Sequence, residues 1–249
     1  MGKIIYSLVL VKKDSGKFTK LLSSLKGILG ANLSVVFFGE IMAVVSDIKE
    51  TSTLADKSNL VEYAKLIETL AQQFTVLPVQ YGSIMESSEL VENMLKKNYS
   101  KFHENLEKVE NKVEYGLKVF CDSKEIKKEL ASKLGLDVAP KSLQKDKTSI
   151  YKEYLNKKLK EHQLEKSLLE YVDTVIQDIT AQLSKMNPTH KFKKMESESK
   201  IIDAVFLIKK SKQEDLITSV KDLQSKHIGL RLMLTGPWPP YNFVNITIN

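Results

Sequence analysis

Apolar strands and amphipathic helices follow one another in the order strand-helix-strand-strand-helix-strand, and this order occurs twice along the sequence. In the first half, continuous apolar runs predict strands at residues 4–11, 33–38, 41–48 and 76–81. Apolar residues spaced by three or four predict helices between them at residues 17–29 and 59–74. This order is typical of a ferredoxin-like antiparallel sheet with helices on one face. The first half is therefore expected to be an α+β domain.

The second half repeats the order after two further predicted helices at residues 88–97 and 101–112. Strands are expected at 115–120, 190–195, 201–208 and 229–234, and helices at 123–134, 151–185 and 213–226. Ser123 is the expected N-cap of the first of these helices, Gly135 follows its end, and residues 139–147 form a polar loop. We therefore predict two ferredoxin-like α+β domains, at 1–112 and 113–249. The second would carry a helical insertion at about 147–187 and a closing turn rich in proline and aromatic residues.

Composition indicates a soluble, folded protein, because 42% apolar and 28% charged residues are close to the average for globular domains. The apolar run at 4–11 is too short to span a bilayer and is followed by Lys12, Lys13 and Asp14, so a strand explains it better. The single cysteine, Cys121, cannot form an internal disulfide and is expected in the core. Together these features predict a cytoplasmic protein without a membrane partner.

The basic charge of the chain does not indicate a nucleic-acid partner. The formal net charge is +7, but Arg231 is the single arginine of the sequence. Specific recognition of phosphate or guanine depends strongly on the two-pronged guanidinium group, which lysine lacks. We interpret the charge as a solvated lysine-rich surface.

Residues for catalysis or metal binding are not grouped along the sequence. The histidines, His103, His162, His190 and His227, are widely separated, and none has a second histidine or cysteine at metal-ligand spacing. Glycine-rich phosphate loops are also missing from the sequence. The sequence therefore predicts no catalytic residue, no metal site and no cofactor, and we expect a protein that is not an enzyme.

Two short segments differ from ordinary strand and helix patterns. Residues 77–82, Leu-Pro-Val-Gln-Tyr-Gly, place Pro78 within an apolar strand, which restricts that strand to a sheet edge or a bulge. Residues 235–244, Thr-Gly-Pro-Trp-Pro-Pro-Tyr-Asn-Phe-Val, join three prolines to Trp238, Tyr241 and Phe243. Because proline cannot extend a helix or a central strand, residues 236–240 are expected to leave the sheet. The aromatic residues are then either a recognition surface or a plug that closes the domain.

These two segments resemble motifs of the gas vesicle protein F and L family. Residues 236–244 resemble the C-terminal signature of that family, and residues 77–82 resemble its Leu-Pro-Val-Arg-Phe-Gly motif. The segment Glu-Tyr-Gly-Leu-Lys-Val at 114–119 is similar to a third family motif, and residues 207–234 fit the family's final strand-helix-strand. Gln80 stands where the family commonly has arginine, which puts any role of that arginine in doubt here.

The resemblance implies a non-enzymatic accessory or minor structural protein of the gas vesicle. Such a protein would bind the small hydrophobic shell protein, gas vesicle protein A, together with other gas vesicle accessory proteins. It would assist nucleation and assembly or prevent aggregation of the shell protein, in the cytoplasm and at the gas vesicle shell. The residues expected to contact the partner are Pro78, Tyr81, Trp238, Tyr241 and Phe243.

Two other functions are compatible with paired ferredoxin-like domains. A regulatory or ligand-binding module would hold a small molecule in a defined polar pocket. An RNA-binding protein would place aromatic residues on its central strands, whereas the expected strand faces carry aliphatic residues such as Val9, Val205 and Leu207. The first of these is kept as the alternative function.

Overall fold

The computed structural model describes residues 2–10, 15–49, 54–136, 147–186, 188–194, 200–227 and 229–244. Residues 139–146 of the predicted loop and the end of the predicted strand at residue 195 lie outside these ranges. The chain forms two compact units. Unit 1 comprises Met1–Tyr115, Leu207–Lys210 and Gly236–Asn249, and unit 2 comprises Gly116–Phe206 and Ser211–Thr235. The segment from Gly236 thus belongs to the first compact unit, whereas the predicted domains grouped it with the second half.

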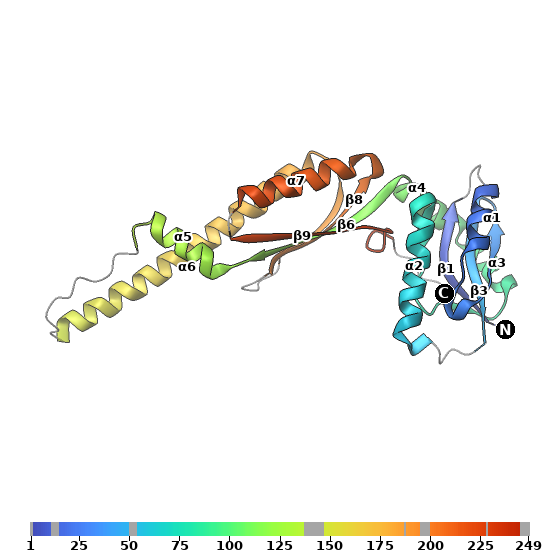
Figure 1. Cartoon of the computed structure of the whole chain (residues 1–249), viewed down its shortest axis with the longest axis horizontal. Helices are drawn as coiled ribbons and strands as arrows, with labels where there is room; N and C mark the ends of the chain where they lie inside the picture. The colour runs from blue at the N-terminus through green and yellow to red at the C-terminus, as the bar shows by residue number, and fades with distance from the viewer. Residues whose placement is uncertain are drawn as a thin grey trace. The chain divides into compact units, whose positions relative to one another are not determined.

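Unit 1 has the predicted ferredoxin-like topology and additional elements (Figure 1). Its elements in chain order are β1 (Gly2–Leu10), α1 (Ser15–Ser24), η1 (Ile28–Gly30), β2 (Leu33–Phe38), β3 (Ile41–Ile48), α2 (Lys57–Gln73), β4 (Thr75–Pro78), β5 (Ile84–Met85), α3 (Ser88–Lys97) and α4 (Tyr99–Val109). The strands are ordered β2-β3-β1-β4, and β5 also pairs with β1. Each of these pairings is antiparallel. The α+β prediction for this half is confirmed.

Helices cover both faces of the unit 1 sheet, where the sequence predicted helices on one face. Side chains of α1 and α2 form one core with strand residues such as Tyr6, Val9 and Val44. Strand β1 is buried from Ile4 to Leu10, so its other face is covered as well. The helices α3 and α4, which contact β1, β2, β3 and β4, provide that second layer.

Pro78 ends β4, which is a terminal strand of the sheet, so the prediction of an edge position is confirmed. The strand is shorter than predicted, because it stops at Pro78 and does not continue to residue 81. Val79 N still donates to Tyr6 O of β1 at 3.1 Å, so main-chain bonding extends one residue beyond Pro78. Gly82 then turns the chain with φ +84° toward β5.

Unit 2 is built on a sheet with the same strand order as unit 1. Its elements are β6 (Lys112–Cys121), α5 (Ser123–Lys133), α6 (Lys147–Ser184), β7 (Thr189–Lys194), β8 (Lys200–Lys209), η3 (Lys210–Lys212), α7 (Gln213–Lys226) and β9 (Leu230–Trp238). The parts of β6, β8, η3 and β9 within Lys112–Tyr115, Leu207–Lys210 and Gly236–Trp238 belong to unit 1. The strands are ordered β7-β8-β6-β9. The helical insertion predicted at about 147–187 is the single long helix α6. Its residues Val172, Val175, Ile179 and Leu183 are buried.

Two predicted helix ends are wrong for local reasons. Helix α1 stops at Ser24 instead of continuing to residue 29, and Leu29 has φ +57°, outside the helical region. The hydroxyl groups of Ser23 and Ser24 bond to Lys20 O and Leu21 O, an interaction that competes with helix continuation. The N-cap of α5 is Asp122 and not Ser123, because the Asp122 carboxylate accepts from the main-chain N–H groups of Lys124 and Glu125.

The expectation that residues 236–240 leave the sheet is wrong for its first three residues. Strand β9 continues through Gly236 and Pro237 to Trp238. This is possible because β9 is a terminal strand of its sheet, so Pro237 needs no ladder partner on the outer side.

Candidate functional site

The candidate site is the C-terminal segment Trp238–Val244, which folds onto unit 1. After Trp238 the main chain turns twice, with Tyr241 N donating to Pro239 O at 2.7 Å and Phe243 N donating to Pro240 O at 3.2 Å. Pro239, Pro240, Phe243 and Val244 are buried. Four buried apolar residues in a short segment anchor it firmly against the unit.

A buried carboxylate holds this turn at its centre. Glu114 lies at the start of β6 and is almost fully buried. Its Oε2 accepts from Asn242 N at 2.8 Å, and its Oε1 accepts from the Asn242 side-chain amide. Two hydrogen bonds to a charged acceptor are worth more than two between neutral groups. The pair therefore fixes both the position and the orientation of the turn.

Two lysines add contacts around the segment. Lys108 Nζ lies 3.5 Å from Phe243 O. Lys210 Nζ donates to Ala71 O and Gln72 O at 3.2 Å each, which satisfies carbonyl groups at the C-terminal end of α2. Burial lowers the pKa of Lys210. A small cavity next to these groups is lined by residues that include Phe74, Lys210, Trp238 and Pro240.

Trp238 and Tyr241 are the aromatic residues of the segment that reach the surface. Trp238 exposes 39% and Tyr241 41% of their surface. Burial raises the pKa of Tyr241 to about 12, and the nearby Glu68 and Glu114 carboxylates add to the rise. Its ring is thus partly exposed while its hydroxyl is desolvated. Trp238, at the end of β9, and Tyr241, in the turn that follows, therefore each expose part of an apolar ring.

The mid-chain residues predicted for the site lie mainly in the core. Pro78 is buried, and Tyr81 is partly buried with its ring 5.0 Å from that of Tyr63. The Tyr63 hydroxyl lies within hydrogen-bond distance of Ile5 O, Tyr6 O and Val79 O, and burial raises the pKa of Tyr63, with Tyr241 and Tyr81 contributing among its neighbours. Tyr81 and Tyr241 therefore lie near the same buried tyrosine.

Sequence reasoning missed Glu114 and Asn242 as a pair, although Asn242 lies in the segment 235–244 and Glu114 begins the motif at 114–119. A carboxylate between apolar residues near the start of β6 is the signal that could have identified Glu114. Its partner is distant in the chain, so sequence spacing carries no indication of the contact.

Other polar groups offer less to a ligand. Cys121 is buried, as predicted, and burial raises the pKa of its thiol, with Asp122 adding to the rise. It lines an open depression of about 640 Å³ with Asp122 and Arg231, whose guanidinium lies 4.8 Å from the centre of the Phe120 ring.

Within the described ranges, there is no group of three or more His, Cys, Asp and Glu residues that could hold a metal ion. Among the described helices, none combines the length and apolarity that a membrane span requires.

Comparison with known proteins gives one consistent result over the whole length. Residues 2–245 match the family model described as gas vesicle synthesis protein GvpL/GvpF. Gas vesicle protein F1 of Halobacterium salinarum is 21% identical over 90% of this chain and 86% of its own length. Gas vesicle protein F2 of the same organism is 33% identical over 31% of this chain and 36% of its own length.

Solved structures share the fold. The crystal structure of gas vesicle protein GvpF from Anabaena sp. PCC7120 has a TM-score of 0.73 at 21% identity, covering 99% of this chain and 97% of that one. The GvpF structure from Microcystis aeruginosa has a TM-score of 0.70 at 18% identity, covering 98% and 99%.

Proposed function

Because this chain belongs to the gas vesicle synthesis protein GvpL/GvpF family, a family of gas vesicle accessory proteins, we propose that it binds the small hydrophobic shell protein, gas vesicle protein A. Through this contact it assists nucleation or assembly of the shell, or prevents aggregation of the shell protein. It acts in the cytoplasm and at the gas vesicle shell, without catalysis, and other gas vesicle accessory proteins are further partners.

The observation that supports this proposal is the partial exposure of Trp238, at the end of β9, and of Tyr241, in the following turn that buried neighbours hold in place. Aromatic side chains held in one geometry lose little conformational entropy on binding and are frequent interface hot spots. The Glu114–Asn242 bonds and the buried Pro239, Pro240 and Phe243 provide that fixation. A shell protein that exposes apolar surface before assembly needs such a cover. Of the residues predicted to contact the partner, Trp238 and Tyr241 are the two that we retain.

The proposal is tested by Trp238→Ala and Tyr241→Ala, with Tyr151→Ala on α6 as a control at another exposed aromatic residue. If the two residues are anchors, each change should weaken capture of purified shell protein by about 2 kcal/mol, while the melting temperature stays nearly constant. If they close the fold instead, stability should fall by roughly 3 kcal/mol or more and capture should fall with it. Unchanged capture with unchanged melting temperature would contradict the proposal.

A further inference from the structure

Strand β2 is an unprotected edge of the unit 1 sheet. It is the terminal strand next to β3, and its sequence, Leu-Ser-Val-Val-Phe-Phe, contains no charge, proline or glycine. Edge strands present unpaired N–H and C=O groups that can pair with another chain. An uncharged apolar edge therefore carries a risk of unwanted association.

The other terminal strands carry the features that normally block such pairing. Strand β4 ends in Pro78, the β7 sequence contains three lysines, and β9 contains Arg231 and Pro237. Lysine and proline are the residues that proteins commonly use to protect sheet edges. Strand β5 also lacks both residues but is only two residues long, so among the longer described strands β2 is the edge without either protection.

The register of the β2–β3 hairpin shows which groups face outward. The two-residue turn at Gly39 and Glu40 joins Phe38 to Ile41, and such a turn makes this pair the one that shares main-chain hydrogen bonds. The bonding pairs alternate along the hairpin, so Val35 and Phe37 direct their N–H and C=O groups to the free edge. Their side chains are 36% and 66% exposed. The outer edge thus combines free main-chain groups with apolar side chains.

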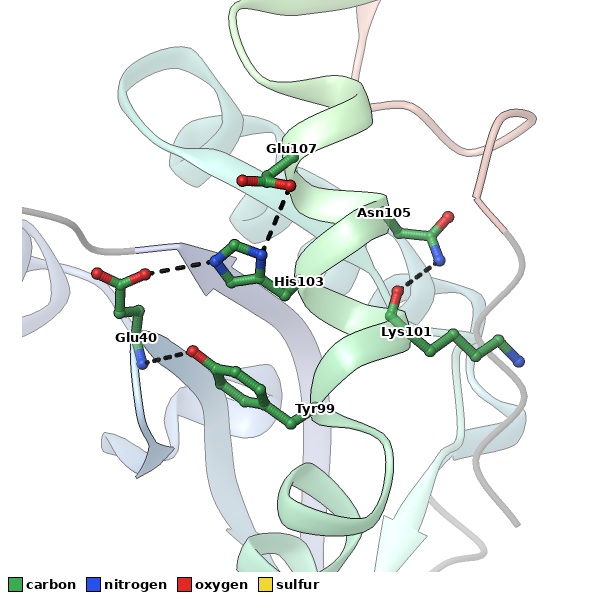
Figure 2. A network of polar contacts seen from close by, with 6 residues as sticks. All are labelled: Glu40, Tyr99, Lys101, His103, Asn105 and Glu107. Atoms are coloured by element: carbon green, nitrogen blue, oxygen red, sulfur yellow. Dashed lines mark hydrogen bonds and ion pairs between the residues drawn. The ribbon is translucent and has the colours of Figure 1, made fainter.

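Side chains of α4 contact the hairpin at its tip (Figure 2). Gly39 has φ +59°, and a Cβ at this position would lie within 3.0 Å of the Tyr99 ring. The Tyr99 hydroxyl accepts from Glu40 N at 3.5 Å, and the Tyr99 ring packs edge-on against Phe38 with centroids 5.6 Å apart. His103 lies 3.4 Å from the Glu40 carboxylate. These contacts from α4 hold β2 in an extended form before any partner arrives, which lowers the entropic cost of binding.

We propose that the free edge of β2 accepts an extended, uncharged apolar β-strand of another polypeptide, through main-chain hydrogen bonds with Val35 and Phe37. This mode of recognition obtains affinity from the main chain and selectivity from alternate side chains. This inference rests on the proposed function, in which the partner that supplies the strand is the shell protein.

A second copy of this chain fits the edge less well. Two copies joined through six-residue strands alone would share a contact about 20 Å long and one strand wide. The surface area buried in such a contact is far below the roughly 800 Å² that each partner buries in a stable interface. An extended strand of a small partner is not part of a large folded unit that would keep it from approaching the sheet closely. It can therefore also cover the exposed side chains of Val35 and Phe37.

The test places lysine on the edge, by Val35→Lys and Phe37→Lys, in the full chain. Val61→Lys and Leu60→Lys are matched controls, since Val61 and Leu60 are 50% and 48% exposed on α2. Two probes are used: purified shell protein, and a synthetic peptide with alternating valine and threonine. We expect both edge variants to weaken binding of both probes at least about tenfold. The controls should stay within about twofold, and all melting temperatures should be close to wild type.

The outcomes separate the two proposals. If wild type captures the shell protein and the edge variants capture it equally well, the edge inference is overturned and the proposed function stands. If wild type captures no shell protein, the proposed function fails; peptide binding that the edge variants lose still supports a strand-accepting edge, and no peptide binding overturns it. A dimer of this chain that both edge variants abolish would assign the edge to a second copy and overturn the inference.

Discussion

Gly236 lies where two chain segments approach too closely for a side chain. Its φ is +120°, and a Cβ built there would lie 2.8 Å from Glu114 O and 3.1 Å from the Tyr115 ring. The residues that follow bring Asn242 to the Glu114 carboxylate, where two hydrogen bonds form. Glycine is therefore required at 236 for the turn to reach its buried acceptor.

Replacement of Gly236 should lower the free energy of unfolding, whereas replacement of Gly16 should not. We expect Gly236→Ala to destabilise the protein by roughly 2 kcal/mol or more, from backbone strain and the contact with Glu114. Gly16→Ala is the matched change in helix α1, where a Cβ would meet nothing within 4 Å. It should be neutral or stabilise by about 0.5 kcal/mol. Urea unfolding of both variants measures the difference, and equal stabilities would contradict this reading of the turn.

The Asp178 carboxylate of α6 contacts the C-terminal end of α7. Asp178 Oδ2 lies 2.7 Å from Lys226 Nζ and 2.8 Å from His227 Nε2. The hydrogen bond from Lys226 is the largest cause that lowers the pKa of Asp178; partial burial opposes it, and the His227 contact adds to the lowering. Asp178 belongs to the long insertion helix, so this cluster ties the insertion to the repeated fold of unit 2.

The pH dependence of this contact follows from the lowered pKa. A carboxylate with a lower pKa in the folded state stabilises the fold above its unfolded pKa of 3.8. That contribution is lost as the pH falls below this value through the folded pKa. We expect Asp178→Asn to cost on the order of 1 kcal/mol at about pH 7, and the difference from wild type to shrink below about pH 4.

The measurement is urea unfolding across this pH range, with Asp222→Asn, an exposed aspartate of α7, as the control. The control should show little difference from wild type at any pH. A wild-type advantage over Asp178→Asn that grows in acid would contradict the assignment.

Unit 1 is assembled from both ends of the chain. Its sheet and helices come from the first residues up to Tyr115, and it is completed by Leu207–Lys210 and the segment from Gly236. Pro239, Pro240, Phe243 and Val244 remove apolar surface from water in this unit. The C-terminal segment is thus a structural part of the N-terminal unit as well as the carrier of Trp238 and Tyr241.

Truncation after Thr235 should therefore weaken unit 1. We expect a loss of roughly 3 kcal/mol or more, because the buried residues of the segment and the Glu114 hydrogen bonds are lost together. Hydrogen exchange should show reduced protection in β1 and α2, and a synthetic peptide of residues 236–244 should restore part of it. A truncated chain as well protected as the full chain would show that the segment does not stabilise unit 1.

Much of the fold could be predicted because its signals are local. The hairpin strands Leu33–Phe38 and Ile41–Ile48 begin and end at the predicted residues, since the Gly39-Glu40 turn lies between two apolar runs. Helix α7 also matches its predicted range. The errors occurred where a side chain competes locally, as at Ser23 and Ser24, or where edge position decides, as at Pro237.

By itself, the sequence determined the kind and order of the elements, the twofold repetition of one topology, and the motifs that carry the family relationship. Hydrophobic periodicity reports which face of an element is buried, and turn residues report where it ends. Only the tertiary structure decided that Trp238 and Tyr241 are exposed while Phe243 is buried, that Glu114 holds Asn242, and that β2 is the unprotected edge. These properties depend on which distant segments become neighbours, and that is set by the strand order of the assembled sheets.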